Sequence, residues 1–466
     1  MNAGAGRITI GSMNAHPHIA TDLGSVIRRQ VPRYTSYPTA PHFTTDVGPE
    51  AYEDWLRRAG ASGLPVSLYL HVPYCRSICH YCGCSTKASR KDGPVRAYVE
   101  VLRREIAMVA ERLGPVAVSH VHWGGGTPNL LGHADFETLV GDLHAHFDLS
   151  AVVEHAIELD PREMGPDDAR FLARMGVNRA SLGVQDLDST VQEAIGRHQP
   201  LELVEAAVSQ LHRAGIGAIN MDLIYGLPFQ THQTIRRTAM HVAGLAPSRI
   251  SLFGYAHVPW FRPNQRLIDE ASLPGGDLRL ALSRTARETI DAFGYEAIGI
   301  DHFARPEDPL TLARDARTLH RNFQGYTTDD AQILVGFGSS SIGRTPWGYV
   351  QNAVANGVWR RAIEQDRLPV ERGRAYAGED LLRAAVIEEL LCFFDVDLAA
   401  VAARHGADPA VLAGGIDTLR PLIAAGWVEV DGWRVAIRTH GPEIARVVAS
   451  AFDAYLGTGG RHSVAV

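Results

Sequence analysis

The sequence has few cysteines, no excess of positive charge and no long apolar run. Five cysteines are too few for a disulfide scaffold, which a chain of 466 residues does not need. A net charge of −7 argues against a nucleic-acid-binding protein, because such proteins concentrate Lys and Arg. The sequence shows neither the roughly 20-residue apolar run of a membrane span nor the apolar segment of a signal peptide. We therefore expect a cytoplasmic globular protein.

Composition and periodicity divide the chain into five parts. Residues 1–30 read as a flexible tail, and residues 31–64, which precede the first β-type run, are expected to form an N-terminal lid segment. Residues 65–300 alternate between β-type and helical patterns. Residues 301–375 look irregular and are expected to connect the two main parts at the active site. Residues 376–466 are rich in Ala, Leu and Val with helical periodicity, and contain the hairpin signal Asp431-Gly432 between two β-type runs.

The alternation of β-type and helical patterns between residues 65 and 300 predicts the fold class. The β-type runs are residues 67–72, 120–123, 154–160, 179–184, 218–225, 250–255 and 297–301. Helical periodicity marks residues 95–112, 201–214 and 276–293. Repeated β-then-α order predicts a parallel sheet. Runs in which both the odd and the even positions are apolar predict strands covered on both faces. We expect an α/β fold with a partial or full (β/α) barrel and a smaller, mainly helical C-terminal domain.

Glycine-rich and polar segments follow several of the β-type runs. They are Trp123-Gly124-Gly125-Gly126-Thr127-Pro128, Asp160-Pro161-Arg162-Glu163, Gln185-Asp186 and Gly226-Leu227-Pro228. In a barrel of parallel strands the chemistry lies at the carboxyl ends of the strands. These segments therefore predict one functional rim.

Four of the five cysteines lie within ten residues. Cys75-Arg-Ser-Ile-Cys79-His-Tyr-Cys82 has the spacing C-x3-C-x2-C and follows the first β-type run directly. Three thiolates on one short loop can hold an iron–sulfur cluster and leave one iron open to another ligand. A zinc site would prefer a second C-x2-C pair, which the sequence lacks. Cys84 is expected not to be a ligand, and Cys392 to be a buried apolar residue.

The spacing of the three cysteines at the first strand of a β/α domain resembles the radical S-adenosylmethionine (SAM) superfamily. The segment Gly124-Gly125-Gly126 resembles that family's glycine motif, because residues without a Cβ let backbone groups approach a ligand closely. The resemblance implies a [4Fe–4S] cluster held by Cys75, Cys79 and Cys82. It also implies that SAM binds the open iron and is cleaved to methionine and a 5′-deoxyadenosyl radical.

Within this superfamily the chain resembles the oxygen-independent coproporphyrinogen III oxidases (dehydrogenases) of the HemN type. The motifs that carry the resemblance are Arg33-Tyr-Thr-Ser-Tyr-Pro-Thr39, Cys82-Gly-Cys84, His122-Trp-Gly-Gly-Gly-Thr-Pro128, Glu158-Leu-Asp-Pro-Arg-Glu163, Gly183-Val-Gln-Asp186, Asp222-Leu-Ile-Tyr-Gly-Leu-Pro228, Tyr255-Ala-His257, Asp301-His-Phe-Ala-Arg-Pro306 and His320-Arg-Asn-Phe-Gln-Gly-Tyr-Thr-Thr328. They extend over most of the chain.

This second resemblance implies a reaction, cofactors and partners. Two propionate side chains of coproporphyrinogen III would be decarboxylated oxidatively to vinyl groups, giving protoporphyrinogen IX in anaerobic haem biosynthesis. The enzyme would use one [4Fe–4S] cluster and two SAM molecules. An electron donor such as a flavodoxin or ferredoxin system would reduce the cluster. A cytoplasmic monomer without a nucleic-acid partner or a membrane span is expected.

The same resemblance implies the cofactor-binding residues, although no catalytic residue is assigned. Those expected at the cluster-bound SAM are Tyr69, Gly125, Glu158 and Ile342. Those expected at the second SAM are Tyr81, Gly126, Thr127, Gln185, Arg197, Asp222 and Ala256.

The residue types alone support these roles unequally. Glu158 and Asp222 lie in β-type runs, where an unpaired charge is costly to bury, so a ligand or an Arg partner is expected. Arg197 reads from the sequence alone as a surface charge, and Tyr69 and Ile342 read as core residues. His302 and His320 fit structural roles as well as substrate roles.

The substrate would require groups that bind carboxylates. Arg33, Arg305 and Arg321 are the candidates for the substrate carboxylates. Residues 33–39 are polar and aromatic and look like poor core material, so they are expected to form part of a lid over the barrel.

Two other functions remain open from the sequence. A related radical SAM branch acts as a haem-binding chaperone, but it generally lacks the Tyr-Thr-Ser-Tyr-Pro segment and the Cys-Gly-Cys extension. A tRNA-modifying enzyme is disfavoured by the acidic balance. The C-terminal part resembles a winged-helix module, yet its twelve acidic and seven basic residues would repel nucleic-acid phosphates.

Overall fold

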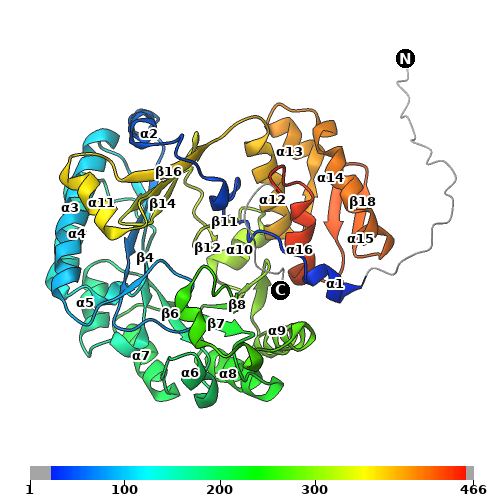
Figure 1. The fold of residues 1–466 in the computed structure, drawn as a ribbon, viewed down its shortest axis with the longest axis horizontal. Coiled ribbons are helices and arrows are strands. Elements are labelled where there is room, and N and C mark those ends of the chain that lie inside the picture. The colour runs from blue at the N-terminus through cyan, green and yellow to red at the C-terminus, as the bar shows by residue number, and fades with distance from the viewer. Residues whose placement is uncertain (1–21, 458–466) are drawn as a thin grey trace.

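A computed structural model describes residues 22–457, and its centre is one large curved sheet. The strands of this sheet lie in the order β16-β15-β14-β13-β1-β4-β5-β6-β7-β8-β10-β9. Figure 1 shows the sheet as the wall of a partial barrel, with helices covering its outer side. The predicted fold class is confirmed.

Six neighbouring strands form most of the parallel part of the sheet. They are β1 (Val66–Val72), β4 (Val118–Gly125), β5 (Glu154–Leu159), β6 (Arg179–Gln185), β7 (Ala218–Tyr225) and β8 (Arg249–Gly254). The helices on the outer side are α3 (Gly93–Leu113), α4 (His133–His146), α5 (Asp168–Arg174), α6 (Ser189–Ala194), α7 (Leu201–Arg213), α8 (His232–Gly244) and α9 (Gly276–Asp291). The six β-type runs between residues 67 and 255 and the three helical stretches predicted from periodicity are therefore confirmed.

The two edges of the sheet differ from the sequence-based expectation. At one edge, β9 (Glu296–Ile298) and β8 both pair antiparallel with β10 (His302–Ala304), so the run at 297–301 is not a further parallel strand. Next to β1 on the other side lies β13 (Ile333–Phe337), which pairs parallel with β1. Beyond it, β14 (Ile342–Thr345), β15 (Gly348–Asn352) and β16 (Val370–Ala375) continue antiparallel.

The prediction that residues 301–375 are irregular is therefore wrong. They contain the four strands just described at the β1 side, α10 (Pro309–Asp315), α11 (Asn356–Glu364) and the small hairpin of β11 (His320–Asn322) and β12 (Gly325–Thr327). Glycines interrupt the apolar pattern of these strands and hid them. Gly343 is one example, because a Cβ there would lie 3.0 Å from the carbonyl oxygen of Leu334 on the neighbouring strand.

A buried carboxylate fastens this sheet extension to the barrel. Glu105 of α3 accepts hydrogen bonds from the Gly338 N–H at 2.7 Å, from Asn352 Nδ2 at 2.6 Å and from Trp359 Nε1 at 3.1 Å. Burial nevertheless raises the pKa of Glu105 to about 7. The three donors come from three different segments, so one side chain holds them together.

The parallel strands have one apolar and one polar face. Along β6 the residues alternate strictly between buried and half-buried, and the buried ones pack under the outer helices. The inner face is polar and lines a central cavity of about 300 Å³, to which β5, β6 and β7 contribute Glu154, Glu158, Ser181 and Asp222. The expectation of strands covered by apolar packing on both faces is therefore wrong for the inner face, which surrounds a cavity.

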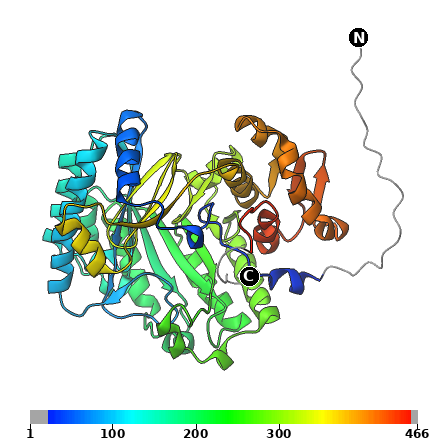
Figure 2. The same ribbon diagram turned by 45° about the horizontal axis from the view of Figure 1, so that its top comes forward.

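The C-terminal part forms a separate hydrophobic core beside the barrel (Figure 2). Its elements are α12 (Asp380–Phe393), α13 (Leu398–Arg404), α14 (Ala413–Thr418), α15 (Arg420–Ala424), α16 (Gly441–Ser450), β17 (Asp395–Asp397), β18 (Val428–Asp431) and β19 (Arg434–Ile437). The strands β18 and β19 form the predicted hairpin, with Gly432 at φ +57° in its turn. Cys392 is buried in this core, as predicted.

The N-terminal segment packs against this second core. Residues 1–21 of the predicted tail lie outside the described residues, but α1 (Leu23–Ile27) is a helix that buries Val26 and Ile27. Tyr34 and Tyr37 are also buried, and Tyr34 Oη donates a hydrogen bond to Asp453 at 2.9 Å. The expectation that residues 33–39 are poor core material is therefore wrong.

Further along, α2 (Pro49–Ala61) packs on α3 and places Trp55 and Leu56 in the barrel core. Residues 31–64 thus contribute to both cores. Within residues 22–457, no helix combines the length and the apolar character needed to cross a membrane.

Candidate active site

The cysteine motif lies on the loop that leaves the carboxyl end of β1. Cys75 ends the short strand β2 (Tyr74–Cys75), which pairs with β3 (Lys87–Ala88) on the far side of the loop. Cys75, Cys79 and Cys82 line one cavity of about 190 Å³, named here the cysteine cavity. All are free thiols in the structure. The pairing of β2 with β3 therefore joins the two ends of the predicted loop, and the cysteine cavity lies at the rim of the barrel.

Donors point at the sulfurs of Cys75 and Cys79. Thr127 Oγ1 donates to Cys75 Sγ at 3.3 Å. Arg197 Nη1 and Arg162 Nη2 donate to Cys79 Sγ at 3.6 Å and 3.7 Å. Burial raises the pKa of Cys75 to about 11, while the hydroxyl of Thr127 opposes this rise. Two guanidinium groups therefore lie against the sulfur of Cys79.

Cys84 acts on its neighbour Cys82. The backbone N–H of Cys84 lies 3.4 Å from Cys82 Sγ, and the thiol of Cys84 also hydrogen-bonds to it. These contacts lower the pKa of Cys82 to about 6 and raise the pKa of Cys84 well above its ordinary value. The geometry therefore makes Cys84 a donor to the sulfur of Cys82.

The three thiols fit a cluster better than a single metal ion. Among residues 22–457, no group of three or more His, Cys, Asp or Glu side chains converges on one ion position. A cubane does not require such convergence, because each thiolate binds a different iron. Donors to all three sulfurs suit anionic ligands of this kind.

The glycine segment after β4 lies directly against the cysteine loop. Gly125 has φ +109°, and a Cβ there would lie 2.5 Å from the ring of His71. A Cβ on Gly126 would lie 2.5 Å from the carbonyl oxygen of Tyr74. The backbone N–H of Gly126 donates to Val72, and that of Thr127 donates to Tyr74, each at 2.8 Å. Only glycine lets these two chain segments approach so closely.

Glu158 is held as a carboxylate at the end of β5. Its oxygens accept hydrogen bonds from the Gly125 N–H at 3.1 Å and from His122 Nε2 at 3.3 Å. Burial would raise the pKa of Glu158, but His122 and the Gly125 N–H outweigh burial and lower it. The partners of Glu158 are thus an imidazole and a backbone N–H, and not the arginine that was one of the two expectations from the sequence.

Arg197 is buried, so its interpretation as a surface charge is wrong. Only 6% of the residue is exposed. Its guanidinium donates to both oxygens of Asp160, at 3.0 Å and 3.2 Å, and to the carbonyl oxygen of Gly183 at 2.6 Å. Arg162 also binds Asp160, at 2.6 Å. Arg197 Nε is buried without a partner among the described residues, which leaves a donor for a ligand.

Asp222 and Gln185 complete the polar side of the cysteine cavity. Asp222 accepts hydrogen bonds from Asn220 Nδ2 at 2.8 Å and from Ser181 Oγ at 3.2 Å. Burial, followed by the nearby charge of Glu158, raises the pKa of Asp222. Gln185 ends β6 with φ +69°, a conformation that few non-glycine residues adopt.

The remaining predicted residues lie at the edge of this group. Tyr81 lines the cysteine cavity, and Tyr69 Oη contacts His71 Nδ1 at 3.0 Å. The carbonyl oxygen of Ala256 accepts from Gln265 Nε2 at 3.1 Å. Ile342 does not line the cysteine cavity; it lies on β14, two residues beyond Ser340, whose Oγ is 3.2 Å from His71 Nε2. The structure therefore places Tyr69 and Ser340, but not Ile342 itself, in contact with His71.

Sequence reasoning gave no individual role to several residues of the site, although Asp160 and Arg162 lie in a segment that it marked as part of the functional rim. His71 touches the tyrosine, the glycine segment and Ser340, while Asp160 and Arg162 form the charged group below Cys79. Asp160 and Arg162 stand in the segment after β5, so their position at a strand end was the available signal. No pattern in the sequence marked His71.

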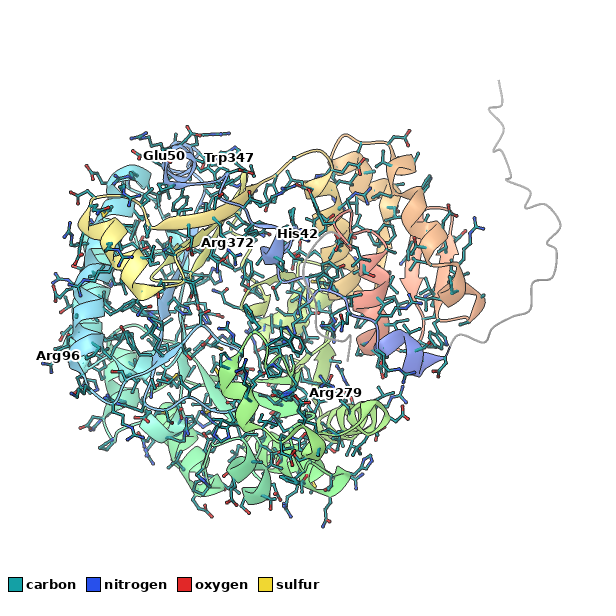
Figure 3. The ribbon with its side chains drawn as sticks, in the orientation of Figure 1. His42, Glu50, Arg96, Arg279, Trp347 and Arg372 are labelled. Carbon is teal, nitrogen blue, oxygen red and sulfur yellow. The ribbon has the colours of Figure 1, made fainter. Side chains whose placement is uncertain are left out.

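A second cavity, of about 180 Å³, lies between the barrel rim and α16, and is named here the arginine pocket. Five arginines line it: Arg33, Arg279, Arg287, Arg321 and Arg446. Figure 3 labels Arg279 on α9, on the side of the barrel near α16. The lining carboxylates are Asp301 and Glu443, so positive charge is in excess.

Two arginines of this pocket, Arg279 and Arg321, are incompletely paired. Arg279 Nε and Arg321 Nε are buried without hydrogen-bond partners among the described residues. Burial lowers the pKa of Arg33 and of Arg279. Buried cations that lack full compensation fit an anionic ligand. Arg305, in contrast, lies over the ring of Tyr295 outside the pocket, so its predicted place beside Arg33 and Arg321 is wrong.

The two histidines separate into different environments. His302 lines both the arginine pocket and the central cavity, and its Nδ1 lies 2.7 Å from Asp301. His320 lies 3.4 Å from Glu388 of α12 and lines neither cavity. The structural role thus fits His320, whereas His302 faces the site.

The cavities form a continuous series. Glu158, Ser181 and Asp222 line both the cysteine cavity and the central cavity. Phe253, His302 and Gln324 line both the central cavity and the arginine pocket. A molecule held by the arginines can therefore extend toward the cysteine loop.

Known proteins resemble this chain in sequence and in fold. Residues 69–242 match the model of the Radical SAM superfamily. An "Oxygen-independent coproporphyrinogen III oxidase" of Bradyrhizobium diazoefficiens is 46% identical over 94% of this chain and 97% of its own length. The protein of the same description from Paracoccus denitrificans is 43% identical over 94% and 97%. The solved structure of coproporphyrinogen III oxidase (HemN) from Escherichia coli, described as a radical SAM enzyme, superposes with a TM-score of 0.87 at 36% identity, covering 92% of this chain and all of that one.

Proposed function

The chain belongs to the oxygen-independent coproporphyrinogen III oxidases of the radical SAM superfamily, and from this membership we propose how its own residues divide the work. The reaction is the oxidative decarboxylation of coproporphyrinogen III in haem biosynthesis. The cofactors are a [4Fe–4S] cluster and SAM. When both are bound, the reduced cluster would give one electron to SAM, which would yield methionine and a 5′-deoxyadenosyl radical able to take a hydrogen atom from a propionate.

Cys75, Cys79 and Cys82 hold the cluster, and the surrounding donors stabilise their negative charge. The observation that carries this assignment is that all three sulfurs line one cavity and each receives a hydrogen bond. Arg162 and Arg197 place positive charge beside Cys79. Such contacts make a thiolate ligand less costly and adjust the reduction potential of the cluster.

The residues around the cysteine cavity bind two SAM molecules. Glu158 and Asp222 offer carboxylate oxygens for an ammonium group or ribose hydroxyls, and Arg197 Nε offers a donor for a carboxylate. The backbone at Gly125 and Gly126 admits a ligand closely because no Cβ intervenes. Tyr69 and Ile342 belong to the site of the cluster-bound SAM, and Tyr81, Thr127, Gln185 and Ala256 belong to the second.

The arginine pocket anchors the substrate. Coproporphyrinogen III carries four propionates, of which two keep their carboxylates. Arg33 and Arg321, together with Arg279, face a cavity with excess positive charge that connects to the cysteine cavity. Carboxylates held there would leave the reacting propionate free to extend toward the cluster. His302, at the junction of the cavities, faces the macrocycle.

A flavodoxin or ferredoxin system is the proposed electron donor, and the protein is proposed to act as a monomer in the cytoplasm. The four clustered thiols support a reducing compartment, since such thiols stay free there.

Anaerobic reconstitution tests this function. The protein is loaded with iron and sulfide, supplied with SAM and a strong reductant, and given coproporphyrinogen III. We expect methionine, 5′-deoxyadenosine, CO2 and protoporphyrinogen IX. Tight haem binding without release of CO2 would instead support a haem chaperone, and a fully loaded cluster that yields no 5′-deoxyadenosine would contradict the radical reaction.

A further inference from the structure

The chain contains 45 Lys and Arg residues, of which only two are lysines. Both lysines, Lys87 and Lys91, follow the cysteine motif within ten residues of Cys82. Residues 76–96 carry five basic residues and one acidic residue, in a chain whose net charge is −7. The strongest local departure from the overall charge thus lies beside the cluster loop.

This basic segment is exposed and lies close to a cluster ligand. Lys87 and Lys91 are exposed, and β3 pairs with β2, so that Lys87 stands opposite Tyr74 and Ala88 opposite Cys75. The Ser89 N–H donates to the carbonyl oxygen of Cys75 at 2.8 Å. Strands paired in this way lie about 4.8 Å apart, so the segment is one strand spacing from the backbone of Cys75.

The basic side chains of this segment are available for a partner. Lys87, Arg90 and Lys91 make no ion pair or side-chain hydrogen bond with the residues between 22 and 457. The only acidic residue, Asp92, is bound by Arg76 at 2.7 Å, and the same arginine donates to the carbonyl oxygen of Ser89 at 3.3 Å. Arg76 therefore fixes the turn and neutralises its carboxylate. Figure 3 shows Arg96, at the start of α3, at the outer edge of the molecule.

Two exposed aromatic residues flank the same loop. Trp260 is 60% exposed and Phe261 is 67% exposed. The segment that carries them holds the cluster loop, because Asn264 Nδ2 donates to the carbonyl oxygens of Cys79, His80 and Cys82 at 3.0–3.1 Å. Arg262 Nη2 lies 3.4 Å from Ser85 Oγ, two residues before Lys87. Apolar and basic groups therefore adjoin at the loop.

We propose that Lys87, Arg90 and Lys91, with Trp260 and Phe261, form the docking surface for an acidic one-electron carrier protein of the flavodoxin or ferredoxin class. Complementary charge steers such a carrier toward this face, and interfaces of redox partners are small and transient. Lysine suits a transient contact, because its hydrated ammonium on a flexible stem makes fewer fixed hydrogen bonds than the fork of arginine.

Docking here would bring the reduced carrier close to Cys75. The carrier would be oxidised by one electron and the cluster reduced by one, with no atom transferred. The inference rests on the proposed function, since it requires a cluster on this loop.

Zero-length cross-linking provides a sharp test, because the chain has so few amines. The reconstituted protein is mixed with a purified acidic flavodoxin and a carbodiimide, which joins lysine amines to carboxylates. We expect cross-linked peptides that contain Lys87 or Lys91. Cross-links confined to the N-terminal amine, or none at all, would overturn the proposal.

Charge-reversal variants provide a second measurement of the same contact. At low salt we expect Lys87→Glu/Lys91→Glu to weaken flavodoxin binding by roughly tenfold or more, and added salt to remove the difference. Lys87→Arg/Lys91→Arg keeps the charge and is expected to bind within a few-fold of the unaltered protein. The matched control Arg420→Glu/Arg438→Glu reverses two exposed charges of the C-terminal domain and should bind normally.

Two further observations separate the possible failures. With dithionite as the reductant, which needs no docking, the lysine variants should cleave SAM as the unaltered protein does. Absence of cleavage in the unaltered protein would contradict the proposed function, whereas cleavage together with unchanged flavodoxin binding in the Glu variant would overturn the docking surface alone. Binding to phosphatidylglycerol vesicles through the same lysines, without binding to flavodoxin, would assign this face to a membrane surface and also overturn it.

Discussion

Replacing Arg197 tests both the stability of the site and the second SAM. The side chain is buried and makes two contacts with Asp160, at 3.0 Å and 3.2 Å, and one of 2.6 Å with the carbonyl oxygen of Gly183. Removing one member of a buried ion pair typically costs about 3–5 kcal/mol. Since Arg162 continues to bind Asp160, we expect Arg197→Ala to lower the free energy of unfolding by an amount near the lower bound, about 3 kcal/mol.

Binding of SAM should respond separately. Loss of the donor Nε and of the positive charge should weaken the affinity for the second SAM by roughly tenfold to hundredfold, while the affinity for the first SAM stays unchanged. Equilibrium dialysis of the reconstituted protein measures this as a change from two bound molecules to one. Arg197→Lys keeps the charge but cannot span both oxygens of Asp160, so an intermediate loss is expected.

Arg170→Ala serves as the matched control. Arg170 is an exposed arginine that also pairs with an aspartate, Asp167, and such pairs contribute at most about 1 kcal/mol. The reasoning would be refuted if Arg197→Ala bound two SAM molecules normally and unfolded at the same urea concentration as Arg170→Ala.

Three further predictions concern other parts of the molecule. Cys79→Ser should lose the iron and the brown absorbance of the cluster. Cys84→Ser should retain most of the iron, because Cys84 donates to the sulfur of Cys82 and is not itself a ligand. Equal loss of iron in both variants would contradict the proposed ligand set. The pKa of Glu105 is raised to about 7 in the folded protein, from an ordinary value near 4.3, so its contribution to stability is complete below about pH 4 and is lost as the pH rises through 7, by up to roughly 3 kcal/mol. Glu105→Gln should therefore flatten this part of the profile of urea stability against pH. An unchanged profile would argue against the raised pKa. Arg279→Ala should weaken binding of coproporphyrin III, measured by fluorescence, and reduce its preference over the tetramethyl ester, whereas Arg305→Ala should not; equal effects would argue against the arginine pocket.

The sequence predicted the parts of the fold that depend on local pattern. The strands and helices of the parallel barrel have unbroken periodicity, and the hairpin at Gly432 has a two-residue turn signal, so both were found within a few residues. The cysteine spacing likewise identified the loop that lines the cysteine cavity. In each case the information lies within a short stretch of chain.

The parts that were missed depend on contacts between distant segments. Arg197 looks like any surface charge until β6 and Asp160 enclose it. Tyr34 looks polar until its hydroxyl meets Asp453, 419 residues away. The strands β13–β16 are short and contain glycine. The pairing of β13 with β1, and of the other three strands beyond it, supplies the order that their own residues do not predict. Local propensity was overridden by tertiary packing in all three cases.

The arginine pocket lies between the two hydrophobic cores of the protein. Arg279 belongs to the barrel and Arg446 to α16 of the C-terminal part, while Arg33 comes from the N-terminal segment between them. The cysteine cavity, in contrast, lies wholly on the barrel. Separate cores can open at different temperatures. On gentle heating the protein should therefore release the porphyrinogen before it releases SAM. A partly unfolded molecule would still be able to generate a radical, with no substrate to react with it.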